Sequence, residues 1–189
     1  ISGNNLAAGS VTSITATDTL KYRHIVDLKA FAKDQYIRGM RGAGNEEMYH
    51  FFVSPQVMAD LKLDSDFLSN VRSAGIRGPN NELFAGSSSL MVDGVMVHEF
   101  RHVPNTSQGT SGSQKGGSGS DIDFAACLFC GAQALAMADI GLPEIVEDTF
   151  DYGNQNGISI GKIMGVKKPK YNSDISGQDE DFGVIRVDC

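Results

Sequence analysis

Five consecutive residues, His98 to His102, spell the zinc-protease pattern H-E-x-x-H. In that pattern two histidines bind one zinc ion and the glutamate acts as general base in hydrolysis. The chemistry requires a helix, because four residues then advance about 6 Å and both imidazoles reach the same ion. In a strand four residues span about 13 Å, which one tetrahedral ion cannot bridge. The element around His98 therefore decides whether this motif can bind zinc.

The residues beside the motif favour a strand. Three β-branched residues, a turn pair and a proline surround it: Val92, Val95, Val97, Asp93-Gly94 and Pro104. A helix between that turn and that proline would have about two turns built from poor helix formers. We therefore predict a hairpin turning at Asp93-Gly94, with residues 95–103 as its returning strand. A zinc-dependent hydrolase that uses His98, Glu99 and His102 stays an alternative function.

The three cysteines do not form a recognisable site. Cys127 and Cys130 make one C-x-x-C, but there is no second pair to complete a zinc ribbon, and the surrounding residues are apolar. We predict that these two are buried structural thiols and leave Cys189 unassigned. An odd number of cysteines also makes no disulfide framework, so a reducing compartment is expected.

Three other stretches suggest chemistry and are explained more simply. Gly161-Lys162 fails the phosphate-loop pattern, because residue 156 is Asn and residue 163 is Ile. We interpret the acidic run 179–181 as a solvated turn. Lys167, Lys168 and Lys170 are interpreted as a solvated edge, with a subunit contact or packaged nucleic acid as alternatives. No catalytic, cofactor-binding or metal-binding residue is therefore predicted.

Composition limits the classes of protein further. The chain has 189 residues and a net charge of -7, with a pI near 5.0, which suits one folded unit and opposes tight binding to nucleic-acid phosphates. The longest apolar run, Phe124 to Ala138, is shorter than the roughly 20 residues that cross a bilayer. We therefore expect neither membrane insertion nor sequence-specific binding of DNA.

The order of elements indicates an α+β fold. We predict a helix from an N-cap at Asp18 to about Ile37 with Gly39 past its end, a strand at 48–53, and a helix that opens at Ser54-Pro55. A second short helix is capped by Asp64 or Ser65. Further along we predict a loop at about 75–90, a mobile Gly/Ser loop at 105–120, a buried helix over 124–140, and then short strands joined by turns.

Six stretches in this order resemble the major capsid proteins of tailed bacteriophages with the Hong Kong 97-type fold, in the coliphage N4-type family. They are TDTLKYRHIVDLKAFAKD, YHFFVSPQVMADLK, NNELFAGSSSLMVDGVMVHEF, LFCGAQALAMA, DYGNQNGISIGKIMGVKKPKYN and DFGVIRVDC. The family's N-terminal arm and extended loop are missing, so we expect residues 1–189 to be a trimmed or partial subunit. The 105–120 loop is an insertion relative to the family.

The resemblance implies a structural function and no enzyme activity or cofactor. Copies of the subunit are expected to assemble into hexamers and pentamers of an icosahedral virion shell that encloses double-stranded DNA, in the cytoplasm of a bacterial host. Scaffold or decoration proteins are further partners that it allows. It implies peripheral-domain parts at approximately 10–45 and 145–189 and an axial-domain part at 46–144. A soluble binding module that contacts its partner through the 105–120 loop is the third candidate.

Overall fold

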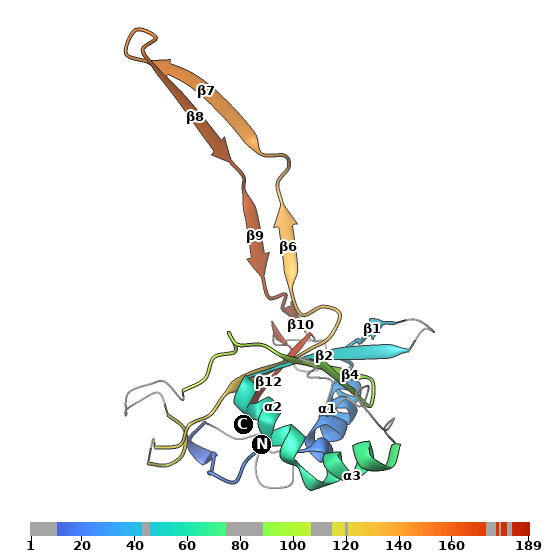
Figure 1. Ribbon diagram of the computed structural model, residues 1–189. Coiled ribbons are helices and arrows are strands. Elements are labelled where there is room, and N and C mark those ends of the chain that lie inside the picture. The colour runs from blue at the N-terminus through green and yellow to red at the C-terminus, as the bar shows by residue number, and fades with distance from the viewer. Residues whose placement is uncertain are drawn as a thin grey trace.

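The main elements of the described residues are a six-stranded sheet, three α-helices on one side of it and a long two-stranded ribbon (Figure 1). The computed structural model describes residues 11–42, 46–74, 89–106, 115–119, 121–172, 177, 179–180 and 183–189. Because the ribbon projects away from the sheet and helices, we call these the ribbon and the body.

The body is built on one mixed sheet. Its strands run in the order β12-β5-β2-β4-β3, with β1 beside β2; β2 and β4 are parallel, and the other pairs are antiparallel. Their bounds are β1 Met40–Arg41, β2 Glu47–Val53, β3 Ser89–Val92, β4 Val95–Glu99, β5 Ala126–Cys130 and β12 Val184–Asp188. A short 3-10 turn, η1, covers Val11–Ser13, and the helices are α1 Tyr22–Asp34, α2 Pro55–Leu63 and α3 Ser65–Ala74.

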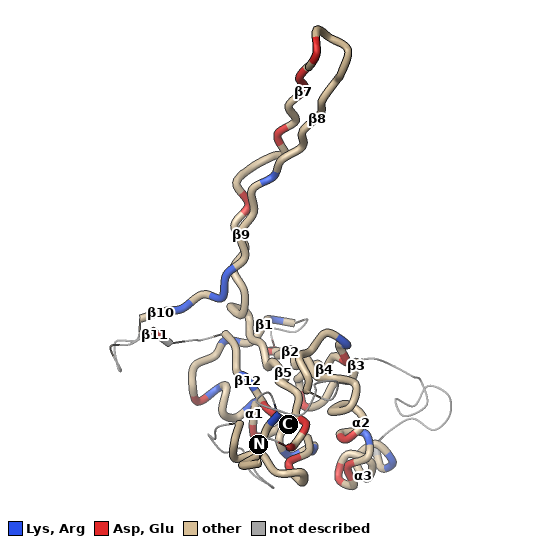
Figure 2. The backbone as a smooth tube through the Cα atoms, turned by 90° about the vertical axis from the view of Figure 1, so that its left-hand side faces the viewer, with Lys and Arg blue, Asp and Glu red and all other residues tan. Residues whose placement is uncertain are grey.

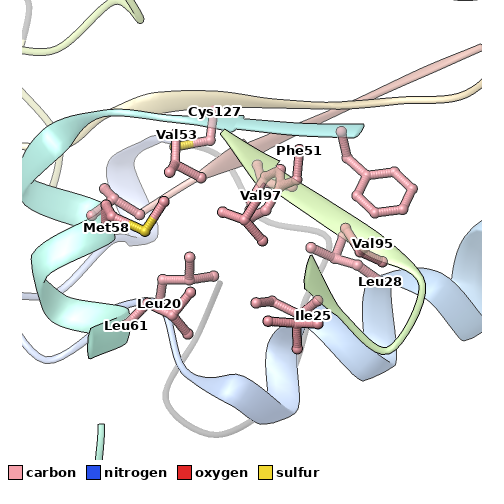
Figure 3. Packing of buried hydrophobic residues seen from close by; sticks show 14 of the residues in the cluster. Leu20, Ile25, Leu28, Phe51, Val53, Met58, Leu61, Val95, Val97 and Cys127 are labelled. Carbon is pink, nitrogen blue, oxygen red and sulfur yellow. The ribbon is translucent and has the colours of Figure 1, made fainter. Parts of the chain in front are cut away.

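The core lies between the helices and one face of this sheet (Figure 3). Alternate residues of β2 point into it, because successive side chains of a strand face opposite sides. Tyr49, Phe51 and Val53 are fully buried there, and Phe129 of β5 stacks on Tyr49 with 5.2 Å between ring centroids. Burial raises the pKa of Tyr49, whose hydroxyl donates a 2.9 Å hydrogen bond to the carbonyl oxygen of Ile37.

Two short-range predictions are confirmed. Ser54 is the N-cap of α2, with its Oγ accepting a hydrogen bond from the Val57 N–H and Pro55 in the first helical position. Asp93 and Gly94 turn the hairpin of β3 and β4 with φ values of 47° and 76°, as a type I′ turn requires. Both features depend on neighbouring residues only. The α3 helix likewise begins at Ser65, as predicted from Asp64 and Ser65.

The predicted bounds of the first helix were too wide. The carboxylate of Asp18 accepts hydrogen bonds from the N–H and hydroxyl of Thr15, so it closes a turn before the helix and does not cap α1. Lys21 is the N-cap residue. At the other end Tyr36, not Gly39, adopts the left-handed conformation, with φ 57°. The helix therefore covers Tyr22–Asp34.

The predicted buried helix over residues 124–140 is wrong. Residues 126–130 form β5, a central strand that pairs with both β2 and β12, and its side chains alternate between the core and the opposite face. The alanine-rich stretch after Gly131 forms β6, in which every side chain is exposed. Partners far along the chain supply the hydrogen bonds of β5, and they override the helix propensity of this composition.

Two antiparallel strand pairs form the ribbon, as the prediction of turn-linked strands after residue 140 indicated. β6 Ala136–Asp139 pairs with β9 Met164–Lys167 near the body, and β7 Glu144–Phe150 pairs with β8 Gln155–Gly161 beyond it. From residue 136 to residue 150 this is roughly 50 Å of extended chain. A further small pair, β10 Tyr171–Asn172 with β11 Asp179–Glu180, lies where the ribbon rejoins the body.

Two predicted loops fall mainly outside the described residues. Residues 75–88 and 107–114 are not described, so the loops predicted at about 75–90 and 105–120 stay predictions there. Both ends of the loop predicted at 105–120 contact residues 122–125. Bridges join Asn105 to Ala125 and Gly116 to Ile122, and the Lys115 ammonium lies 3.2 Å from the Asp123 carboxylate.

Candidate functional site

The structure places the two histidines of the zinc-protease pattern on extended chain and a turn. His98 lies in β4 as predicted, but the strand ends at Glu99 and His102 lies in the turn that follows. The partner of His98 is His50 of the parallel strand β2. The Nδ1 of His50 lies 2.8 Å from the Nε2 of His98. Phe52 stacks on the His98 ring, with 5.1 Å between ring centroids. Within the described ranges, no group of three or more His, Cys, Asp or Glu side chains could hold a metal ion.

The cysteines of the C-x-x-C do not act together. Cys127 and Cys130 are three residues apart in β5, so their thiols point to opposite faces of the sheet. Cys127 is buried as predicted, whereas Cys130 is only half-buried. Cys189, which the sequence left unassigned, hydrogen-bonds to Cys127 through its side chain, and this contact lowers the pKa of Cys127 and raises the pKa of Cys189.

The charged stretches at Lys162 and at residues 179–181 are not arranged as a phosphate-binding or catalytic site would require. Lys162 is in the ribbon and forms a 2.8 Å ion pair with Asp139, with no helix following it as a phosphate loop would require. Asp179 and Glu180 form the short strand β11, where a solvated turn was predicted, and Asp181 is outside the described residues. No helix in the described part of the chain is both long and apolar enough to cross a bilayer.

The most unusual surface of the described chain is the ribbon. Its large hydrophobic side chains are not covered: Ile145, Ile158 and Ile160 are 62%, 67% and 70% exposed. Ten others between residues 135 and 166 are exposed as well, namely Leu135, Met137, Ile140, Leu142, Val146, Phe150, Tyr152, Ile163, Met164 and Val166. A two-stranded ribbon alone is at best marginally stable in water, and exposed apolar patches of this extent mark interaction surfaces.

The two faces of the outer strand pair differ. Ile145 lies opposite Ile160 and Glu147 lies opposite Ile158, so three isoleucines form a stripe on one face. On the other face Gly157 and Gly161 carry no side chain, and the ring of Phe150 lies over Gly157. The isoleucine stripe is therefore the face that can bury the most apolar area.

Sequence reasoning missed this surface. It recognised alternating strands after residue 140, but it had no basis for expecting both faces of those strands to stay exposed, since a polar face and an apolar face usually alternate. The isoleucines at 145, 158, 160 and 163 were the available signal, because they place large apolar side chains close together in two neighbouring strands. His50 was also missed, since 48 residues separate it from His98.

Comparison with known proteins identifies the family. Residues 1–189 match the family described as phage capsid protein. A major capsid protein of Pseudomonas phage KPP25 is 52% identical over 179 residues, which are 94% of this chain and 47% of that relative. The chain belongs to the phage capsid protein family. The finer N4-type grouping stays a prediction.

Solved structures agree on the fold. The capsid of Ralstonia phage GP4 superposes with a TM-score of 0.62 at 30% identity, over 95% of this chain and 49% of that one. The Cyanophage Pam1 capsid asymmetric unit gives a TM-score of 0.70 at 22% identity, over 93% of this chain and 48% of that one. The predicted Hong Kong 97-like α+β capsid fold is confirmed. The chain spans about half the length of the relatives it matches.

Proposed function

We propose that the protein is the major capsid subunit of a tailed bacteriophage, and that its function is to build a shell and not to catalyse a reaction. Copies tile a virion shell as hexamers and pentamers, through contacts that repeat around each ring. Family membership supports this proposal, as does the 52% identity with a phage major capsid protein. The extended backbone at His98 also removes the main sequence argument for a zinc hydrolase.

The observation that carries the proposal is the uncovered ribbon. Side chains such as Ile145 and Ile160 are too apolar and too exposed to suit residues 1–189 alone in water. An assembly removes them from water, and each fully buried isoleucine contributes about 1.5–3 kcal/mol to association. The ribbon is therefore the element that extends from one subunit and contacts its neighbours.

We also propose a division of labour within the chain. The prediction of peripheral parts at approximately 10–45 and 145–189, and an axial part at 46–144, stays a prediction. The core supports one adjustment, because α1 packs with α2, β2 and β5 in a single cluster that also includes Val187 of β12. We assign the whole body to the axial part and the ribbon to the peripheral part.

The proposed cargo is double-stranded DNA, which the shell encloses without recognising its sequence. A net charge of -7 supports this, because an acidic protein gains little from counterion release at phosphates. Scaffold and decoration proteins, and assembly in the host cytoplasm, are part of the same proposal and follow from the family alone.

Negative-stain electron microscopy of the full-length protein tests the function. The expected result is closed shells or free hexamers and pentamers at micromolar concentration. A protein that stays monomeric in every buffer, at concentrations up to the millimolar range, would overturn the proposal. A soluble binding module predicts that monomer, and it also predicts that deleting residues 105–120 abolishes partner binding.

A further inference from the structure

Charge is unevenly distributed along the ribbon. Its outer part, residues 140–161, contains four acidic residues and no lysine or arginine: Glu144, Glu147, Asp148 and Asp151. The next nine residues, 162–170, contain four lysines and no acidic residue. Figure 2 shows the result, with red segments toward the tip and blue segments where the ribbon meets the body. We call residues 140–161 the acidic tip, and residues 167–171, where the ribbon meets the body, the ribbon root.

The ribbon root lies beside further cations from the body. A hollow of about 580 Å³ is lined by Lys33 and Arg38 from the end of α1 and its following loop, and by Tyr171 from the root. A neighbouring hollow of about 630 Å³ is lined by Arg38 and Arg41. Glu47 is the acidic residue on both hollows. Three exposed cations therefore line these hollows, namely Lys33, Arg38 and Arg41, and three more exposed cations, Lys167, Lys168 and Lys170, come just before Tyr171 along the chain.

The acidic tip cannot reach the root of its own chain. β6 and β9 separate the two, since they are paired along their whole length between the body and the β7–β8 hairpin. The one acidic residue of that inner section, Asp139, is paired with Lys162 across the ribbon at 2.8 Å. Any contact between tip and root therefore joins different molecules.

From this pattern we propose that the acidic tip of one ribbon docks on the basic root of a second copy of the chain. The inference rests on the proposed function and names the contact that orients neighbouring subunits. Opposite charges at the two ends of one extended element favour tip-to-root contact and oppose tip-to-tip and root-to-root contact, because like charges repel. Tyr152, fully exposed at the turn of the tip, and the isoleucine stripe add apolar area to the same contact.

A charge exchange tests the proposal. The tip variant combines Glu144→Lys with Glu147→Lys, and the root variant combines Lys167→Glu with Lys170→Glu. All four positions are exposed, so both variants are expected to fold. Each variant alone is expected to raise the critical concentration for assembly by about ten-fold or more, as light scattering and electron microscopy measure it. The variant that carries all four changes is expected to assemble within about three-fold of wild type, because the charges again oppose one another.

A matched control separates the specific contact from total charge. Lys62→Glu with Arg72→Glu, on helices of the body, makes the same change in net charge as the root variant and is expected to assemble nearly as wild type. The proposal is overturned if the tip variant or the root variant assembles normally. It is also overturned if the variant with all four changes assembles no better than the tip variant or the root variant. Root variants that assemble normally but package less DNA would assign the lysines to nucleic acid instead. Wild-type protein that never assembles would refute the proposed function itself.

Discussion

The imidazoles of His50 and His98 lie edge to edge across two parallel strands. The Nδ1 of His50 and the Nε2 of His98 are 2.8 Å apart, the rings are within 9° of parallel, and the ring centroids are 5.1 Å apart. That centroid separation is close to the largest value a 2.8 Å contact between ring nitrogens allows, so the two rings point directly at each other. One of the two nitrogens donates a hydrogen bond to the other, and a separation of 2.8 Å leaves no room for a metal ion between them.

This pair makes the stability of the fold depend on pH. Burial, and secondly the charge of His50, lower the pKa of His98 below its usual 6.5. The unfolded chain therefore binds more protons than the folded chain between that lowered pKa and 6.5. The contribution of the pair is present above pH 6.5 and is lost as the pH falls through the lowered pKa. The charged and titratable groups on the same sheet face are Cys130 opposite His50, and the Arg186–Asp188 ion pair on β12.

The melting temperature should therefore fall more between pH 7.5 and pH 5.5 in wild type than in His98→Gln. At pH 7.5 the substitution should also cost about 1 kcal/mol of unfolding free energy, because one hydrogen bond is lost. His102→Gln removes a histidine outside the pair and is the control, expected to keep the wild-type pH dependence. Equal pH dependence in wild type and His98→Gln would contradict the assignment.

Removing metal ions should leave the fold unchanged. The histidines of the H-E-x-x-H pattern do not converge, since His98 contacts His50 and Phe52, while His102 lies edge-on to the ring of Phe100 at 5.4 Å. We expect less than one-tenth of a zinc ion per chain by elemental analysis, and the same melting temperature with and without EDTA. Stoichiometric zinc that disappears in His98→Ala would restore the hydrolase alternative.

Gly131 should tolerate no side chain. It follows β5 at the place where the chain leaves the body for the ribbon, and its N–H donates a 2.8 Å hydrogen bond to the Gly183 carbonyl oxygen. A Cβ there would lie 2.5 Å from the carbonyl oxygen of Arg38. Gly131→Ala should lower the unfolding free energy by about 1–3 kcal/mol, measured by urea denaturation. Gly165→Ala, in β9 with no atom within 4 Å of the added Cβ, is the control and should change it little.

The isoleucine stripe should matter for assembly and not for folding. Changing Ile145, Ile158 and Ile160 together to threonine keeps β-branched side chains but removes apolar area that neighbouring copies would bury. The body should melt at the wild-type temperature, because these side chains are already exposed in the single chain. The critical concentration for assembly should rise by about ten-fold or more. The same three positions changed to valine are the matched control and should assemble.

Local chemistry made some of this fold predictable. The step from β2 into α2 follows from Ser54 and Pro55, and the β3–β4 hairpin follows from Asp93 and Gly94, each within four residues. The strand β5 was not predictable in the same way. Its hydrogen bonds go to β2 and β12, more than 50 residues away on either side, and its own composition favours a helix.

The candidate site was even less predictable. The Lys167–Lys170 cluster and the acidic residues before it are visible in the sequence, but their separation along one extended element appears only once β6 to β9 are paired. His98 lies on a strand as predicted, because the β-branched residues beside it and the Asp93-Gly94 turn favour an extended backbone, whereas the strand ends at Glu99 and His102 lies in the turn that follows. The partner of His98 required the parallel pairing of β2 with β4.

The central claim is that neighbouring subunits cover the ribbon in the assembled shell. Hydrogen–deuterium exchange of the full-length protein, before and after assembly, measures this directly. We expect the amides of residues 136–167 to exchange at least about ten-fold more slowly in shells, while buried strands such as β2 change little. Ribbon amides that exchange equally fast in both states would show that the ribbon stays uncovered and would contradict the account.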